Sequence, residues 1–238
     1  MRQERAWVAV LACGMLTVAG SARSSDELSP QARSRAEQLA AKGNYRAAIE
    51  EYRRAVGETP NNAVLQNRLG VCYQMTGNLG AALKAYERAL KLNPGYAEVY
   101  NNVGTVQHSR RKYRKAVDAY RKALESKPSM ATAHKNLGAA YLALGELDLG
   151  ITAFQEALRL DPTAFDSGKG EAVGVSGLNP GLQHFMLAKI HARNGDAEAA
   201  LACLKRAQDA GFRDIGKAAG DPDFKGIVQD ARFVTLTR

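Results

Sequence analysis

The fold of this chain is decided by residues 63–162, which read AVLQNRLGVCYQMTGNLGAALKAYERALKLNPGY (63–96), AEVYNNVGTVQHSRRKYRKAVDAYRKALESKPSM (97–130) and ATAHKNLGAAYLALGELDLGITAFQEALRLDP (131–162). When the three segments are aligned, the same residue types recur every 34 positions. The clearest markers are prolines, which stand at Pro60, Pro94, Pro128 and Pro162. A fixed period of this length predicts an array of stacked structural repeats.

Each repeat is predicted to form two helices, because its apolar residues follow the spacing of three, four and seven that marks one helix face. In the unit 63–96, the first helix carries Leu69 and Gly70, and the second carries Ala82 and Tyr86. The small residues let the two backbones approach each other, and the ring fills the groove beside them. One helix pair cannot bury its apolar face alone, so each repeat needs its neighbours.

The recurring residues resemble the tetratricopeptide repeat family. Four units match between about Pro30 and Pro162, and a looser fifth unit lies between Gly181 and Phe212. The resemblance implies an all-α fold, a right-handed α-solenoid of about five helix-turn-helix repeats with a short helical C-terminal cap. Arg111 departs from the pattern, because the other units have a glycine between their two helices.

The repeats divide the chain into consecutive segments. We expect a signal peptide at 1–22, a flexible leader at 23–29, repeats at 30–62, 63–96, 97–130 and 131–162, a Gly-rich insertion loop at 163–180, a degenerate fifth repeat at 181–212 and a C-terminal cap at 213–238. The cap is predicted from apolar residues at short helical spacing, which include Phe224 and Phe233.

The N-terminus has the features of a secretory signal. Residues 6–20 are apolar and uncharged after a short charged start, and residues 19–22 are small, as signal peptidase requires. We expect cleavage near Ala22 and an exported, periplasmic or secreted, mature chain without a membrane span. An uncleaved N-terminal segment that anchors the chain in a membrane stays open as an alternative, and so does lipidation of Cys13.

The sequence contains no recognisable catalytic or metal-binding motif. It has no nucleophile elbow, no His-Glu-x-x-His and no paired cysteines at metal-ligand spacing. Cys72 and Cys203 fall in different repeats and are interpreted as small buried hydrophobic residues. We therefore expect no enzymatic activity, no cofactor and no metal. The alternative is an enzyme or regulatory subunit that uses the 163–180 loop, since long loops often carry function.

Function is expected on the concave surface, because the first helix of each repeat lines the inner groove in the family that this chain resembles. The resemblance places nine candidate binding residues there: Asn67, Arg68, Val71, Asn101, Asn102, Thr105, His108, Lys135 and Asn136. Asn102 and Asn136 hold the same motif position in successive repeats. Side-chain amides both donate and accept, so one hypothesis is that these two grip the backbone of an extended chain. The alternative is that asparagine is simply common at this position.

The net charge of the chain is +9, which favours an acidic protein or peptide partner or an anionic envelope surface. The basic residues are not interleaved with exposed aromatic residues, because packing takes up most of the motif tyrosines. A nucleic-acid partner is therefore not expected. Taken together, the sequence predicts a non-enzymatic protein-interaction scaffold of the cell envelope that holds a protein segment in its groove.

Overall fold

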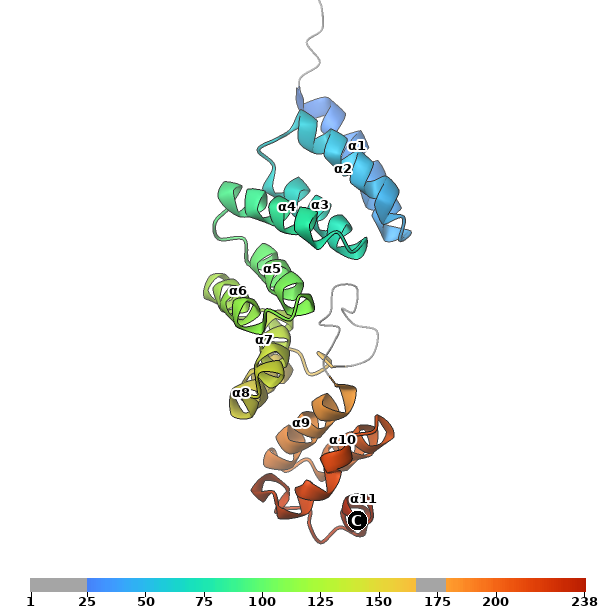
Figure 1. Cartoon of the computed structure of the whole chain (residues 1–238), viewed down its shortest axis with the longest axis vertical. Coiled ribbons are helices and arrows are strands. Elements are labelled where there is room, and N and C mark those ends of the chain that lie inside the picture. The colour runs from blue at the N-terminus through green and yellow to red at the C-terminus, as the bar shows by residue number, and fades with distance from the viewer. Residues whose placement is uncertain (1–24, 166–178) are drawn as a thin grey trace, which may run out of the picture.

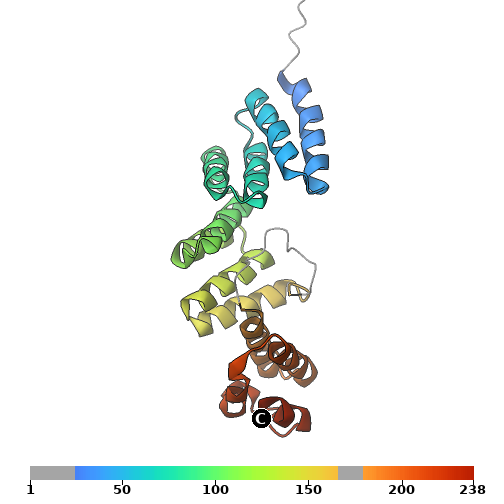
Figure 2. The same cartoon turned by 45° about the vertical axis from the view of Figure 1, so that its right-hand side comes forward.

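The computed structural model describes residues 25–165 and 179–238, and every regular element in these two ranges is helical. The helices pair into hairpins that stack along the long axis of the molecule, with α1 at one end and α11 at the other (Figures 1 and 2). The chain is therefore an α-solenoid, as predicted. The expected signal peptide and most of the 163–180 loop lie outside the described residues.

The five repeats are built from helices α1 to α10. Their bounds are α1 Ser25–Ala41, α2 Tyr45–Glu58, α3 Ala63–Met75, α4 Leu79–Leu92, α5 Ala97–Ser109, α6 Tyr113–Ser126, α7 Ala131–Leu144, α8 Leu147–Leu160, α9 Pro180–Arg193 and α10 Ala197–Asp209. The first helices of repeats two, three and four start at Ala63, Ala97 and Ala131, 34 residues apart, as the sequence period requires.

Several helix starts are stabilised by a capping side chain. Asn44, Asn78 and Asp196 precede second helices, and Asn62 precedes a first helix. In each case the side-chain oxygen accepts a hydrogen bond from a backbone N–H three residues ahead. This arrangement satisfies an amide that has no partner inside the helix.

The contact inside each hairpin explains why a glycine and a ring recur. The rings of Tyr86, Tyr120 and Phe154 are almost fully buried. Each lies against the backbone of a glycine in the preceding helix; a Cβ atom built on Gly104 would approach Cε1 of Tyr120 to 2.5 Å. Only glycine leaves room for the ring at this distance, so the two helices can pack closely.

The N-terminal end differs from the prediction. Helix α1 begins at Ser25, so residues 25–29 are helical and are not the flexible leader that we expected. The sequence offers a reason, since Ser25 is followed by two acidic residues. Acidic residues are favourable at a helix N-terminus because of the helix dipole.

The C-terminal residues cover the end of the fifth repeat. They form the 3₁₀ helices η2 (Arg213–Gly220) and η3 (Pro222–Phe224) and the short α11 (Ala231–Thr237). Phe224 and Phe233 are buried in the same apolar cluster as the fifth repeat. Lys189 of α9 adds ion pairs of 2.6 Å to Asp221 and 3.1 Å to Asp223.

Two further expectations concern cysteines and membrane spans. Cys72 and Cys203 are both buried and unpaired, as predicted. Among the helices of the described ranges, none combines the length and the apolar character needed to cross a bilayer.

Arg111 keeps the turn that glycine makes in the other repeats. Its φ is 59°, in the left-handed region, while Gly77 and Gly145 at the equivalent turns have φ of 78° and 81°. Because a side chain makes this conformation costly, we expect Arg111→Gly to raise the free energy of unfolding by about 1 kcal/mol. Thermal and urea denaturation followed by circular dichroism measure the change.

The matched control for this prediction is Arg110→Gly. Arg110 is also exposed, but its φ of −84° suits any residue. Glycine at this position should leave the unfolding midpoint unchanged or lower it. If Arg111→Gly also fails to raise the midpoint, the turn is not strained.

Candidate functional site

The first helices of repeats two, three and four form a continuous surface on the inner side of the solenoid. Helix α5 contacts both α3 and α7. In Figure 1 the stack bends, with α6 and α8 along its left side and α5 and α7 nearer the middle. Residues on the exposed side of α3, α5 and α7 therefore line the concave surface, here called the inner face.

Asparagine side chains connect successive repeats along this inner face. Nδ2 of Asn102 donates to Oδ1 of Asn67 at 3.0 Å, and Nδ2 of Asn136 donates to Oδ1 of Asn101 at 3.0 Å. The two bonds are equivalent, one joining α3 to α5 and the other α5 to α7. They form a ladder that fixes how each repeat sits on the next.

The structure divides the nine candidate residues into two groups. Five are buried: Asn67, Asn101, Thr105, His108 and Asn136. The other four keep accessible surface: Arg68 is exposed, and Val71, Asn102 and Lys135 are half-buried. A bound segment could touch the second group directly, whereas the first group shapes the surface from below.

Thr105 and Asn101 belong to one buried polar network. Oγ1 of Thr105 donates to the backbone carbonyl of Asn101 at 3.0 Å, and the hydroxyl of Tyr120 lies 3.4 Å from Oγ1 of Thr105. The network links the inner face of α5 to the ring that packs inside the hairpin. Burial raises the pKa of Tyr120 strongly, so its hydroxyl keeps its proton as a donor.

His108 is buried, with only 3% of its surface exposed. Neither ring nitrogen makes a hydrogen bond of normal geometry to a residue in the described ranges, although the backbone of Ala139 lies near the ring. The imidazole packs edge-on against the ring of Tyr113, with the centroids 4.9 Å apart. Desolvation by burial lowers the pKa of His108 to about 4, although the backbone of Ala139 opposes the shift. The ring is therefore neutral at pH 7.

Lys135 is held at the edge of the inner face by residues that follow the fourth repeat. Its Nζ donates to the backbone carbonyl of Ala164 at 2.9 Å and lies 5.8 Å from the ring centroid of Phe165. Lys135 as a whole is half-buried.

The hydrogen-bonded asparagine pairs between repeats were not predicted from the sequence, although the sequence contains a signal for them. Asn67 and Asn102 are 35 residues apart, and so are Asn101 and Asn136. A separation of one repeat plus one residue places the partners at adjacent motif positions in successive repeats. A comparison of residues at identical motif positions does not reveal these pairs.

The buried pair should contribute to stability. We expect Asn136→Ala to lower the free energy of unfolding by about 2 kcal/mol, because it leaves the buried Oδ1 of Asn101 without a partner. In a double-mutant cycle with Asn101→Ala, the coupling energy should be about 1 kcal/mol. The matched control is Asn102→Ala. Because Asn102 is half-buried, water can take the place of its amide, and the free energy of unfolding should fall less. A coupling energy near zero for the buried pair would show that the ladder does not stabilise the stack.

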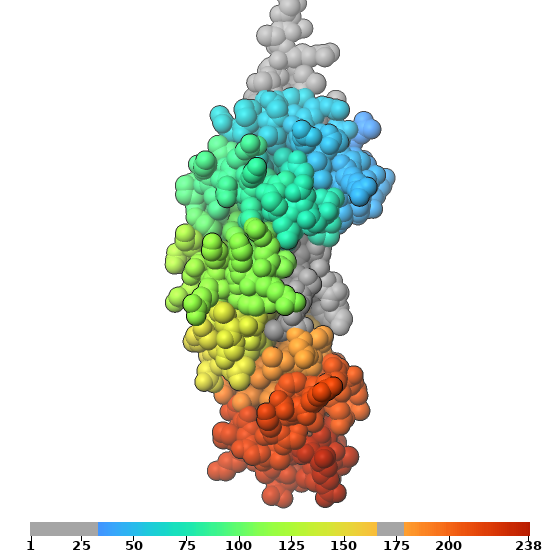
Figure 3. Space-filling model, in the orientation of Figure 1, coloured from blue at the N-terminus to red at the C-terminus, as the bar shows by residue number. Residues whose placement is uncertain are grey.

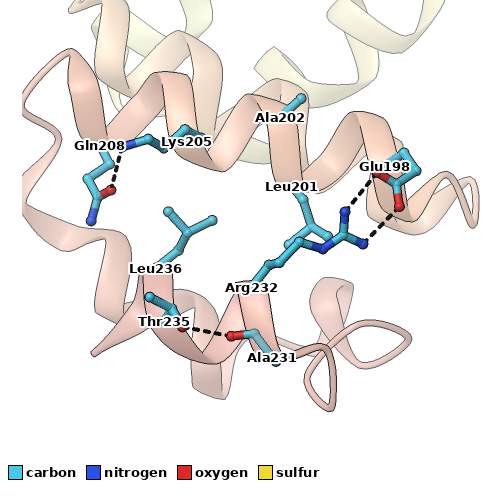
Figure 4. A pocket seen from close by; sticks show the side chains of 9 residues that line it. All are labelled: Glu198, Leu201, Ala202, Lys205, Gln208, Ala231, Arg232, Thr235 and Leu236. Carbon is cyan, nitrogen blue, oxygen red and sulfur yellow. Dashed lines mark hydrogen bonds and ion pairs between the residues drawn. The ribbon is translucent and has the colours of Figure 1, made fainter.

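A second concavity lies at the C-terminal end, outside the predicted groove. It has a volume of about 650 Å³ and runs between α10 and α11. Figure 4 shows Leu201 and Leu236 inside it. The guanidinium group of Arg232 makes two hydrogen bonds of 2.8 and 2.9 Å to Glu198 at one end. This ion pair lowers the pKa of Glu198, so the carboxylate stays charged. The guanidinium group of Arg232 is thereby engaged by Glu198.

Neither concavity offers a clear metal site. Within residues 25–165 and 179–238, no three side chains of histidine, cysteine, aspartate or glutamate lie close enough together to hold a metal ion. His184 is partly buried, and desolvation lowers its pKa.

Comparison with known proteins agrees with this architecture. Family models described as tetratricopeptide repeat match residues 63–96, 85–118, 104–165 and 184–210, which together span more than half of the chain. No curated protein sequence matches the chain.

Solved structures show the same fold. MamA 41-end from Desulfovibrio magneticus RS-1 is 20% identical over 77% of this chain and 95% of its own, with a TM-score of 0.57. PilF of Pseudomonas aeruginosa is 18% identical over 89% of this chain and 90% of its own, with a TM-score of 0.60. These identities are low, so the likeness concerns the fold alone.

Proposed function

Since the chain is a tetratricopeptide repeat protein and its fold is that of a protein-interaction scaffold, we propose that it binds an extended protein segment along the inner face of α3, α5 and α7. The observation that carries the proposal is the asparagine ladder. It fixes the spacing of three repeats and leaves Arg68, Asn102 and Lys135 accessible on one continuous surface.

The accessible side chains suggest the chemistry of the segment. Asn102 uses one N–H for Asn67, which leaves its second N–H and its carbonyl oxygen for a peptide backbone. Arg68 is basic and exposed, while Glu98 of the same surface is paired with Lys127 at 3.0 Å. The bound segment is therefore an extended chain with acidic side chains.

The test uses the accessible residues of the inner face. A partner recovered by affinity purification with the wild type is produced separately, and its affinity is measured by isothermal titration calorimetry. Arg68→Ala combined with Asn102→Ala should weaken binding at least tenfold. The control pair, Asp118→Ala with Arg121→Ala, lies exposed on α6 and should bind like the wild type. Equal affinities of all three proteins would show that the partner does not use the inner face.

We further propose that the protein acts in the cell envelope without enzymatic activity. Support for export comes from the sequence of residues 1–22 alone. After cell fractionation, the chain should appear in the periplasm or medium, and its mass should be that of a chain whose first residue lies near Arg23. A chain of full mass in the membrane fraction would favour the anchored form instead.

The enzymatic alternative depends on the loop at 163–180. If that loop forms an active site, its deletion should abolish a turnover that the intact chain shows with some substrate. A nucleic-acid partner would show binding of DNA or RNA that weakens as the salt concentration rises.

A further inference from the structure

The positive charge of the chain is concentrated in two repeats. Residues 63–130 contain 12 of the 33 lysines and arginines but only 4 of the 24 aspartates and glutamates, a net charge of +8 within a total of +9. Of these basic residues, only Arg68 lies on a first helix. The charge of repeats two and three therefore lies on their second helices and turns, away from the inner face.

Most of these basic side chains form no ion pair within the described residues. Elsewhere many cations are paired, as Arg33 is with Glu37 and Arg232 with Glu198. In contrast, a set of exposed cations on α4, on α6 and in the turn before α6 makes no ion pair with any described residue: Lys84, Arg88, Lys91, Arg110, Arg111, Lys112, Arg114, Lys115 and Arg121. We call this set the outer basic face.

The outer basic face lies on an open surface. Helices α4 and α6 are at the surface of the green region in Figure 3. Lys84, Arg88 and Lys91 follow each other at spacings of four and three residues, so they form one stripe along α4. Lys84 and Arg88 border a hollow of about 350 Å³ that Arg53 also lines.

We propose that the outer basic face docks onto a membrane surface rich in anionic phospholipid. Protein interfaces gain most of their energy from buried aromatic or apolar anchors. Among the described residues of α4 and α6, Leu92 is the only exposed large apolar side chain, and the hollow beside Lys84 and Arg88 has a volume of only about 350 Å³. A charged bilayer needs neither an apolar anchor nor a groove, because it attracts many separated cations at once.

The docking leaves the inner face free, so it does not depend on the proposed function. A chain held through α4 and α6 can still bind a protein segment along α3, α5 and α7. The protein would then hold its partner next to a membrane without inserting into it.

The first test measures binding to vesicles. Residues 23–238, which contain every described helix, are mixed with vesicles of phosphatidylcholine alone or with about 30% phosphatidylglycerol, and sedimentation separates bound from free protein. We expect binding only to the anionic vesicles and its loss at about 0.5 M salt, where charges are screened within a few ångströms. No binding to anionic vesicles at low salt would overturn the proposal.

Two variants of equal net charge test the location. The first neutralises five cations of the outer basic face: Lys84→Gln, Arg88→Gln, Lys91→Gln, Lys115→Gln and Arg121→Gln. The control neutralises five exposed, unpaired cations elsewhere: Lys42→Gln, Arg46→Gln, Arg206→Gln, Arg213→Gln and Lys225→Gln. Circular dichroism checks that both variants fold.

The expected difference between the variants is large. Each basic residue close to an anionic membrane increases binding by about fivefold, so the first variant should lose about 100-fold or more if three of its five residues approach the lipid. The control should bind within about threefold of the wild type. An equal loss in both variants would mean that net charge alone drives binding, which contradicts a docking face.

Acidic proteins and nucleic acids are the competing partners of this face. Polyglutamate and single-stranded DNA are therefore titrated against the same chain at the same salt concentration. If either polymer binds more tightly than the anionic vesicles, the lipid assignment is wrong and the face serves that class of partner.

Discussion

Replacing Gly104 by alanine is expected to lower the free energy of unfolding by about 3 kcal/mol or more. The added Cβ would lie 2.5 Å from Cε1 and 2.6 Å from Cδ1 of Tyr120. The ring cannot move aside, because it is fully buried among Ala116, Val117 and Leu137. Helices α5 and α6 would have to separate, and the solenoid would lose the contact that defines each repeat.

The control is Gly80→Ala on α4. Gly80 is also helical, but a Cβ there meets no atom within 4 Å. Alanine should therefore stabilise the chain by up to about 1 kcal/mol through its helix propensity. In the Gly104→Ala background, Tyr120→Leu should recover part of the loss, because it removes the clashing ring. Similar melting temperatures for Gly104→Ala and Gly80→Ala would refute close packing of the ring on the glycine.

Lowering the pH from 7 to 5 is expected to cost about 2 kcal/mol of stability through His108 alone, and roughly 3 kcal/mol below pH 4. The pKa of His108 falls from an ordinary 6.5 to about 4 in the folded chain. Between these values the unfolded chain binds the proton and the folded chain does not. Stability is therefore complete above pH 6.5 and declines as the pH falls toward 4.

The measurement compares wild type with His108→Leu. Leucine has a similar volume, suits the buried site and does not titrate. Urea denaturation at several pH values gives the difference in unfolding free energy, in which other titrating groups cancel. The wild type should lose stability relative to His108→Leu as the pH falls from 7 to 4. Parallel curves would mean that His108 becomes protonated without loss of structure, and hence that its nitrogens reach water or a partner.

Much of the fold was predictable, because the same residue pattern recurs in each repeat. The spacing of Ala82, Tyr86 and Ala89 marks one helix face, and its recurrence 34 residues later fixes the position of the next helix. The capping residues Asn44 and Asn78 also stand where the sequence requires a helix start. Local patterns of this kind are set by nearby residues, so they can be read without the structure.

The parts that were not predicted depend on neighbouring repeats. Motif position alone placed Thr105 and His108 on the inner face, but both are buried, since α5 packs against α6 and α7. Arg111 was noted as a departure from the pattern, yet the turn keeps its left-handed backbone because the helices on both sides fix it. Such outcomes depend on packing between helices, which the spacing of residues does not describe.

The structure assigns different properties to the two sides of the central repeats. The inner face is built from paired amides with a few accessible polar groups, whereas the second helices carry most of the net charge. A scaffold with this arrangement can bind two kinds of partner without competition between them.

The most direct test of binding at the inner face is photo-crosslinking in intact cells. A benzophenone amino acid replaces Asn102 on the inner face in one strain and Asp118, exposed on α6, in another. We predict that position 102 forms a covalent adduct with one defined protein and that position 118 does not. An adduct of that protein at position 118, with none at position 102, would contradict binding in the groove.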